Sequence, residues 1–206
     1  MKRKNTLRNL LLLTVLLILA LAPMNAQAAS QKTKALKAYQ TFLKKSTVKL
    51  SGRTCKLSSA EFAIVYIDND SVPELLVQPY YKIGNNKLST TALYTYKNNK
   101  MVQLFVTNNG LTYSKCSYYK KTGTFLRYIS HGDYQSYYYY KLAGKKLTKK
   151  LAKEWEAGKT TYHKASGAKI TKAQFNKQLK SLTRSKKASS ITLRRNTASN
   201  RSKYLK

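Results

Sequence analysis

The sequence predicts an α+β fold in which an antiparallel β-meander, a series of hairpins, is flanked by an N-terminal and a C-terminal helix. Two observations predict the helices: apolar residues recur at helical spacing over residues 31–46 and again after residue 171. A third predicts the meander. Between those segments, short runs rich in Tyr, Val, Ile and Thr alternate with turns that contain Asn or Gly.

The first 28 residues have the pattern of a secretory signal peptide. Basic residues precede an apolar run over 10–22, which Pro23 ends. The run is shorter than the roughly 20 residues that a membrane span needs. Ala26 and Ala28 form the small-x-small pattern that a signal peptidase recognises, so we expect cleavage after Ala28. The alternative is an uncleaved N-terminal anchor. The signal predicts a secreted protein, either extracellular or associated with the cell wall.

Basic residues greatly outnumber acidic residues in this chain. The chain has 40 Lys and Arg against 7 Asp and Glu; without the four basic residues of the signal, 36 face the same 7, a net +29. All acids lie between Glu61 and Glu156, so both ends of the exported chain are purely basic. Such an excess repels itself unless anions neutralise it, which favours a polyanionic partner. Outside the cell this means an anionic wall polymer, an acidic glycan or an anionic lipid surface; nucleic acid is less favoured.

Residues 29–184 are predicted to form a single β-rich domain. In the first helix, the side chains Ala35, Leu36, Tyr39, Phe42 and Leu43 share a face. In the last, Thr171 and Gln174 have the spacing of a capping box. Residues 185–206 form a basic C-terminal tail, which is either flexible or tied back to the domain by its apolar residues Ile191, Leu193, Tyr204 and Leu205.

The stretch YIDNDSVPELLV, residues 66–77, contains three of the seven acids: Asp68, Asp70 and Glu74. Carboxylates at this spacing suggest a weak calcium loop. A strong loop would need a further oxygen ligand where Tyr66 stands and a glycine where Ser71 stands. The favoured interpretation is a structural turn between two central strands, because Asp and Asn stabilise bends by accepting bonds from nearby backbone N–H groups.

In form this loop resembles the acidic loop of FG-GAP-type and EF-hand-like repeats, D-x-D-x-D-G-x-P-E-L. The matching positions are Asp68, Asp70, Pro73, Glu74 and Leu75. Together with the hairpins and the closing segments AKITKAQFNKQLKSL and NTASNRSKYL, it is similar to uncharacterised secreted proteins of Gram-positive anaerobes over most of the mature chain. The resemblance implies an exported surface or extracellular protein and brings no established activity.

Export permits a disulfide between Cys55 and Cys116, and the alternative is two separate thiols packed as small hydrophobic residues. The sequence does not decide between the two, since spacing along the chain shows no geometry. Neither cysteine has the spacing of a metal site.

Tyrosines are the most informative side chains for binding. The run Tyr137, Tyr138, Tyr139 and Tyr140, followed by Lys141, Lys145 and Lys146, is the best candidate binding patch. Successive strand residues point to opposite faces, so some rings pack in the core and others are presented among lysines, where they could stack on sugars or bases. The simpler alternative is that these tyrosines only stabilise the sheet by pairing across strands. The sole Trp, Trp155, is expected in the core.

Features of an enzyme are few. His131, Asp133 and His163 are the only histidine-centred candidates, and nothing in the sequence shows that they meet in space. We therefore expect a secreted, highly basic, non-enzymatic protein, with no cofactor unless calcium binds the acidic loop. The alternatives are a hydrolase-type enzyme or weak calcium-binding module using Asp68, Asp70 and Glu74, or a membrane-active cationic protein.

Overall fold

The computed structural model of this chain describes residues 30–110 and 112–206, so the predicted signal peptide lies outside the described residues. The N-terminal helix α1 covers 30–43 within that range. Ten longer strands follow, β1 to β10, and then α2 (Lys172–Thr183) and α3 (Ala198–Tyr204). The predicted α+β fold with a β-meander is confirmed. None of the described helices is long and apolar enough to cross a membrane.

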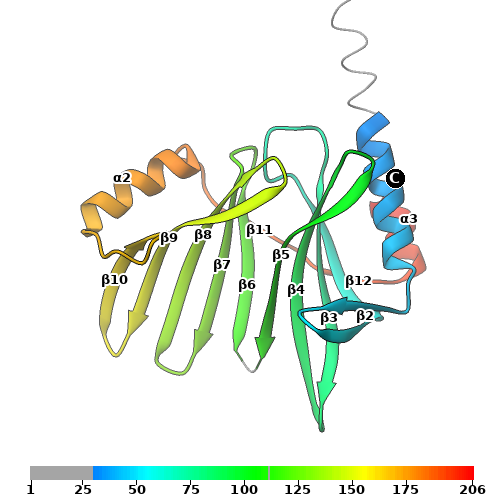
Figure 1. Cartoon of the computed structure of the whole chain (residues 1–206), viewed down its shortest axis with the longest axis horizontal. Helices are drawn as coiled ribbons and strands as arrows, with labels where there is room; N and C mark the ends of the chain where they lie inside the picture. Colours follow the sequence, from blue (N-terminus) through cyan, green and yellow to red (C-terminus); the bar gives the residue numbers. More distant parts are fainter. Residues whose placement is uncertain (1–29, 111) are drawn as a thin grey trace, which may run out of the picture.

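The meander is divided into two six-stranded sheets (Figure 1). Sheet A contains β1 (Thr47–Leu50), β2 (Arg53–Val65), β3 (Glu74–Ile83), β4 (Asn86–Lys97), β5 (Lys100–Gly110) and β12 (Arg194–Arg195). Sheet B contains β6 (Tyr113–Tyr119), β7 (Thr124–His131), β8 (Tyr134–Ala143), β9 (Lys146–Glu156), β10 (Lys159–Lys164) and β11 (Ser189–Ser190). Every pairing between these strands is antiparallel, and the chain passes from one sheet to the other between β5 and β6.

Three core clusters order the molecule into four layers: α1, sheet A, sheet B and α2. The face of sheet A that carries Phe62, Val77 and Tyr94 packs on α1. Its opposite face meets sheet B in a cluster that includes Leu76, Leu93 and Phe125. The outer face of sheet B packs on α2 around Phe175. Figure 1 accordingly shows α2 beside sheet B at one end of the molecule and α1 with α3 beside sheet A at the other.

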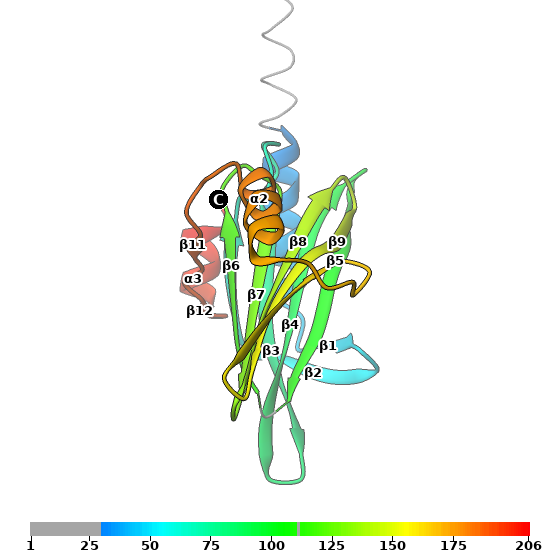
Figure 2. The same ribbon diagram turned by 90° about the vertical axis from the view of Figure 1, so that its left-hand side faces the viewer.

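The predicted hairpin turns are present, and their residues adopt the conformations that tight turns need. Asn98 and Asn99 join β4 to β5 with φ of 54° and 58°, as a two-residue hairpin turn requires. Gly123, between β6 and β7, has φ of 74°, and a Cβ there would lie 3.0 Å from the Leu142 carbonyl oxygen. The hairpin of β3 and β4 extends beyond the other strands in both views (Figures 1 and 2).

The last 22 residues are attached to both sheets. β11 pairs with β6 of sheet B and β12 pairs with β2 of sheet A, so this segment crosses from one sheet to the other. Ile191 and Leu193 pack in the cluster between the sheets, whereas Leu205 is buried under α1. Of the two alternatives for the basic tail, the structure shows the one in which its apolar residues tie it to the domain.

Both predicted helices form with the faces that their spacing indicates. The five apolar side chains of α1 are buried. At the start of α2, the Thr171 hydroxyl accepts a bond from the Gln174 N–H, and the Gln174 side-chain oxygen accepts one from the Thr171 N–H, which completes the predicted capping box. α3 was not predicted, because its sequence ASNRSKY has no apolar face of its own.

Candidate functional site

A large β-bulge in β2 creates a cavity beside the C-terminal segment. The pairing of β2 with β3 is interrupted between Lys56 and Glu61, opposite Pro79 of β3. Proline has no N–H to donate, so inside a sheet it is accommodated where the hydrogen-bond ladder is broken. The bulged residues Ser58 and Ser59 are exposed, and they leave a hollow between β2, the β3–β4 hairpin and the C-terminal segment.

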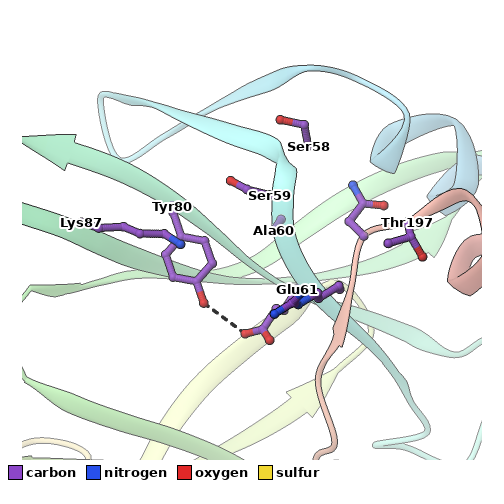
Figure 3. A pocket seen from close by; sticks show the side chains of 9 residues that line it. Ser58, Ser59, Ala60, Glu61, Tyr80, Lys87 and Thr197 are labelled. Atoms are coloured by element: carbon purple, nitrogen blue, oxygen red, sulfur yellow. Dashed lines mark hydrogen bonds between the residues drawn. The ribbon is translucent and has the colours of Figure 1, made fainter.

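This hollow, which we call the bulge pocket, has a volume of about 380 Å³ (Figure 3). Tyr80 and Lys87 approach it from the β3–β4 hairpin, whereas Thr197 lies on the opposite side. Its complete lining is Ser58, Ser59, Ala60, Glu61, Tyr80, Lys87, Arg195, Asn196 and Thr197. An adjoining cavity of about 500 Å³ shares four of these residues and adds Thr54, Lys56, Tyr81 and Lys82. The combined surface is therefore rich in cations and hydroxyl groups.

Two cations at or near these cavities lie over aromatic rings. The Lys87 ammonium lies 4.0 Å from the centre of the Tyr80 ring, and the Arg53 guanidinium lies 5.0 Å from that of Tyr81. The sole carboxylate in the lining, Glu61, accepts a 3.1 Å hydrogen bond from the Tyr80 hydroxyl. Burial and the neighbouring Glu61 raise the pKa of Tyr80, so this hydroxyl stays protonated and remains a donor.

A second basic cavity, of about 390 Å³, lies on the other side of β12. Its charged residues are all cationic: Lys32 from α1, Arg194 from β12, and Lys203 and Lys206 from the C-terminal segment. The first cavity contacts Arg195 and β2 residues up to Glu61, while the second contacts Arg194 and β2 from Phe62 onward. β12 thus stands between two cation-lined hollows.

The side chain of Asn196 connects the elements that surround the bulge pocket. Its buried side-chain amide donates to the Leu43 carbonyl at the end of α1 and to the Leu57 carbonyl in the bulge, at 2.7 and 2.8 Å. Its side-chain oxygen accepts a 2.8 Å bond from Arg201. Leaving a buried carbonyl without a hydrogen-bond donor is costly. Asn196 therefore fixes the helix, the bulge and the C-terminal segment together.

The acidic loop, by contrast, forms the turn between β2 and β3, which we call the acidic corner. Carboxylate oxygens of Asp68, Asp70 and Glu74 lie within 4.8 Å of one another, so the three could in principle hold a cation. Each of them already accepts a bond from the protein: Asp68 from the Asp70 N–H, Asp70 from the Val72 N–H, and Glu74 from the Ile67 N–H. Lys97 also lies 3.7 Å from Asp70. This pattern agrees with the turn interpretation.

The corner also joins the layers. The Gly123 N–H of sheet B donates to the Ile67 carbonyl at 2.7 Å, and the Tyr39 hydroxyl of α1 donates to the Pro73 carbonyl at 2.8 Å. Glu74 is fully buried, and burial raises the pKa of its carboxyl to about 8. Burial, followed by the charge of Asp70, also raises the pKa of Asp68. Glu74 is thus enclosed where helix and sheets meet, whereas Asp68 is half-buried and Asp70 is exposed.

The predicted tyrosine–lysine patch is divided between two faces of sheet B. Tyr139 is buried under α2, whereas Tyr140 packs between the sheets on Phe105, with ring centres 5.4 Å apart. Tyr138 donates to Glu154 at 3.3 Å, and Tyr137 lies on the outer face beside Tyr128. Lys141 bonds to the Thr122 carbonyl, and burial followed by the nearby Arg184 lowers its pKa. Lys145, in the turn after β8, and Lys146, at the start of β9, are exposed.

Cys55 and Cys116 do not form a disulfide; both are free buried thiols. They lie on opposite sides of sheet A: Cys55, on β2, is in the cluster under α1, and Cys116, on β6 of sheet B, is in the cluster between the sheets. The disulfide alternative is therefore wrong for a simple reason: a sheet separates the two side chains. Burial raises the pKa of Cys116 to about 12, which keeps this thiol protonated and unreactive.

The residues of the enzyme hypothesis are not assembled into one site. His131 is exposed at the last position of β7. Gly123 lies just before the first position of the same strand and bonds to Ile67 of the acidic corner. The strand between them spans roughly 25 Å, so His131 is far from the acidic carboxylates. Asp133 is exposed in the turn after His131. His163 lies on the edge strand β10, where its ring nitrogens contact the Gly167 carbonyl and Thr161 at 3.0 and 2.9 Å.

Sequence reasoning missed the bulge pocket. Its residues come from positions between 54 and 197, and no local motif links them. Two signals were present: a proline, Pro79, inside a run typical of a strand, and the polar pair Ser58–Ser59 inside another. Both mark irregular strands, but neither shows what the irregularity would face. Trp155, expected in the core, is half-buried and belongs to none of the three core clusters.

Comparison with protein-family models, curated proteins and solved structures finds no match for this chain. The resemblance of its acidic loop to FG-GAP-type repeats stays a prediction, and function has to be argued from the geometry and charge of the sites themselves.

Proposed function

We propose that this is an exported, non-enzymatic protein that binds an anionic polymer of the cell envelope or extracellular space through the bulge pocket and the cations around it. The observation that carries the proposal is the gathering of four cations from three separated segments around two adjoining hollows: Lys87 and Arg195 line the bulge pocket, and Lys56, Lys82 and Lys87 line the cavity beside it. Folding brings like charges together at an electrostatic cost, which an anionic ligand would offset.

The shortage of carboxylate partners for the other Lys and Arg side chains also supports this proposal. Over residues 30–110 and 112–206, Lys97 is the one Lys or Arg whose side-chain nitrogen lies within 4.0 Å of a carboxylate. A chain with 40 basic residues and 7 acids cannot neutralise itself internally. Its surface therefore attracts a polyanion over a distance set by ionic strength, about 8 Å at physiological salt.

The lining of the pocket suits an anionic group on a polymer better than a free metal or an apolar ligand. Lys87 and Arg195 supply positive charge, while Ser58, Ser59 and Thr197 supply hydroxyl donors. The hydroxyl of Tyr80 already bridges to Glu61, so this carboxylate is partly satisfied within the protein. A phosphate or carboxylate group entering the hollow would meet several hydrogen-bond donors, and the one carboxylate there, Glu61, already accepts a bond from Tyr80.

The test is binding of the exported form of the protein to immobilised polyphosphate over a range of salt. We expect retention at low salt and release near 1 M NaCl, where screening extends to about 3 Å. Replacing Lys87 and Arg195 by Gln should weaken binding about tenfold. A matched control replaces the exposed Lys145 and Lys146 by Gln, with the same loss of charge, and should change affinity by less than about threefold. Equal effects of the two pairs, or retention in 1 M NaCl, would count against the proposal.

A further inference from the structure

The outer face of sheet B is only partly covered by α2. The helix packs over Leu126, Tyr139 and Leu151, which form one row across the strands β7, β8 and β9. Beyond this row, the same face carries Tyr113 on β6, Tyr128 on β7 and Tyr137 on β8. Residues two apart on a strand point the same way, so these tyrosines continue the face that the helix leaves open.

The three rings form a continuous row over adjacent strands, which we call the tyrosine ladder. Ring centres are 6.1 Å apart between Tyr113 and Tyr128 and 4.9 Å apart between Tyr128 and Tyr137. Tyr113 is 62% exposed, and the other two are half-buried. Contacts between neighbouring rings hold them in place, so little side-chain entropy is lost when a ligand stacks on them.

Lysines flank the ladder without acidic neighbours from the same strands. The Lys153 ammonium lies 5.4 Å from the centre of the Tyr137 ring, and Lys115 is directly opposite Tyr128 in the β6–β7 register. The two acids of β9, Glu154 and Glu156, alternate to the opposite face, as the bond from Tyr138 to Glu154 shows. Aromatic rings and positive charge are thus combined on one open surface.

We propose that the tyrosine ladder binds a strand of an acidic polysaccharide, with the C–H faces of its sugar rings stacked on Tyr113, Tyr128 and Tyr137. Carboxylate or phosphate substituents on the sugars pair with Lys115 and Lys153. This inference rests on the proposed function and deepens it by naming the polymer class. A polyanion without rings, such as polyphosphate, gains nothing from the ladder, whereas an acidic polysaccharide uses both rings and charges.

The charge of the chain argues against a second copy as the occupant. Each exported copy carries a net +29, so a self-association through this face would bring more cations towards Lys115 and Lys153. Single-stranded nucleic acid offers stackable rings and negative charge as well. The polysaccharide is favoured because the predicted export places the protein where such polymers are the abundant anions.

The experiment compares two polymers, polygalacturonate and polyphosphate, and measures affinity for both by the same titration at fixed salt. The double variant Tyr128→Ala/Tyr137→Ala should bind polygalacturonate about tenfold more weakly and polyphosphate within about twofold of the unchanged protein. Tyr128→Phe/Tyr137→Phe keeps both rings and should retain polygalacturonate binding. Thermal melting of each variant checks that the fold is intact. If the Ala pair unfolds, Tyr113→Ala, which truncates a mostly exposed ring, should still weaken polygalacturonate binding more than polyphosphate binding, and equal effects would overturn the inference.

Charge is tested separately with Lys115→Gln/Lys153→Gln, which should weaken polygalacturonate binding more than Lys145→Gln/Lys146→Gln does. If the Ala pair loses affinity for both polymers equally, or for neither, the ladder is not a sugar-stacking surface while the proposed function stands. If the unchanged protein binds neither polymer, the proposed function itself fails. Tighter ladder-dependent binding of single-stranded DNA than of polygalacturonate, or a dimer that the Ala pair dissociates, would also overturn the inference.

Discussion

The acidic corner of residues 66–74 and the bulge pocket show opposite relations between sequence and site. The corner is continuous in sequence, and its carboxylates are engaged by backbone donors within the same few residues. The pocket draws on the bulge of β2, the β3–β4 hairpin and the C-terminal segment. Its cations Lys87 and Arg195, and Lys56 and Lys82 of the adjoining cavity, have no carboxylate within 4.0 Å among the described residues.

The difference teaches where charge without an internal partner is found in this molecule. A short acidic motif can satisfy itself, because Asp and Asn side chains reach the N–H groups of the following residues in a turn. Lysines and arginines brought together from distant segments cannot do so when the chain has so few acids. The motif that stood out in the sequence therefore stabilises a joint, and the unsatisfied charge lies elsewhere.

The largest effect is expected from removing the support of the bulge pocket. Asn196→Ala leaves the buried carbonyls of Leu43 and Leu57 without their donor. We expect a loss of about 2–4 kcal/mol in the free energy of unfolding, measured by urea denaturation. The matched control is Asn200→Ala, which removes an exposed bond to the Arg195 carbonyl and should cost less than about 1 kcal/mol. Similar costs for the two variants would contradict the supporting role of Asn196.

An intermediate effect is expected from the buried acid of the corner. The unfolded chain releases the Glu74 proton near the ordinary pKa of 4.5, whereas the folded chain releases it near 8. Between these values the folded state binds more protons at Glu74, so the contribution of this group to stability is greatest below about pH 4.5 and is lost as pH rises to about 8.

The variant Glu74→Gln should lose most of this slope and be more stable than the unchanged protein at pH 8 by about 1–3 kcal/mol. The amide oxygen of Gln can still accept from the Ile67 N–H, so the corner keeps its bond. Urea denaturation at several pH values between 5 and 8 measures the slope of each protein. If the variant shows the same change of unfolding free energy with pH as the unchanged protein, groups other than Glu74 cause the pH dependence.

The smallest effect is expected from calcium. Because Asp68, Asp70 and Glu74 each accept a bond from the protein, calcium at about 5 mM should raise the melting temperature by less than about 1 °C. Magnesium at the same concentration is the control for ionic strength. A calcium-specific rise of several degrees that Asp68→Asn abolishes would restore the calcium-loop interpretation and narrow the contrast between corner and pocket.

Much of the fold could be predicted because its signals are local. Helical spacing identified the buried face of α1, and the pair Thr171 and Gln174 identified the start of α2. Turn residues such as Asn98, Asn99 and Gly123 located the hairpins, since positive φ is unfavourable for most other residues. The division of the meander into two sheets could not be predicted, because strand alternation is the same whether hairpins continue one sheet or begin another.

The sites were predicted less well, for a related reason. Alternation indicates that Tyr137 and Tyr138 face opposite ways, but not that the side of Tyr137 is open while the side of Tyr140 is covered by sheet A. Cys55 and Cys116 could not be assigned to different clusters without knowing which faces pack. The short pieces β11, β12 and α3 have weak patterns of their own, and their structure depends on the surfaces to which they attach.

By itself the sequence determined the charge of this protein, its class of fold, its hairpin turns and its two longer helices, since each depends on composition or on residues within a few positions of one another. Only the tertiary structure decided which faces are covered, where the bulge of β2 opens, and that the basic C-terminal segment joins both sheets. Those outcomes depend on packing between distant segments. The bulge pocket and the tyrosine ladder both belong to this second group.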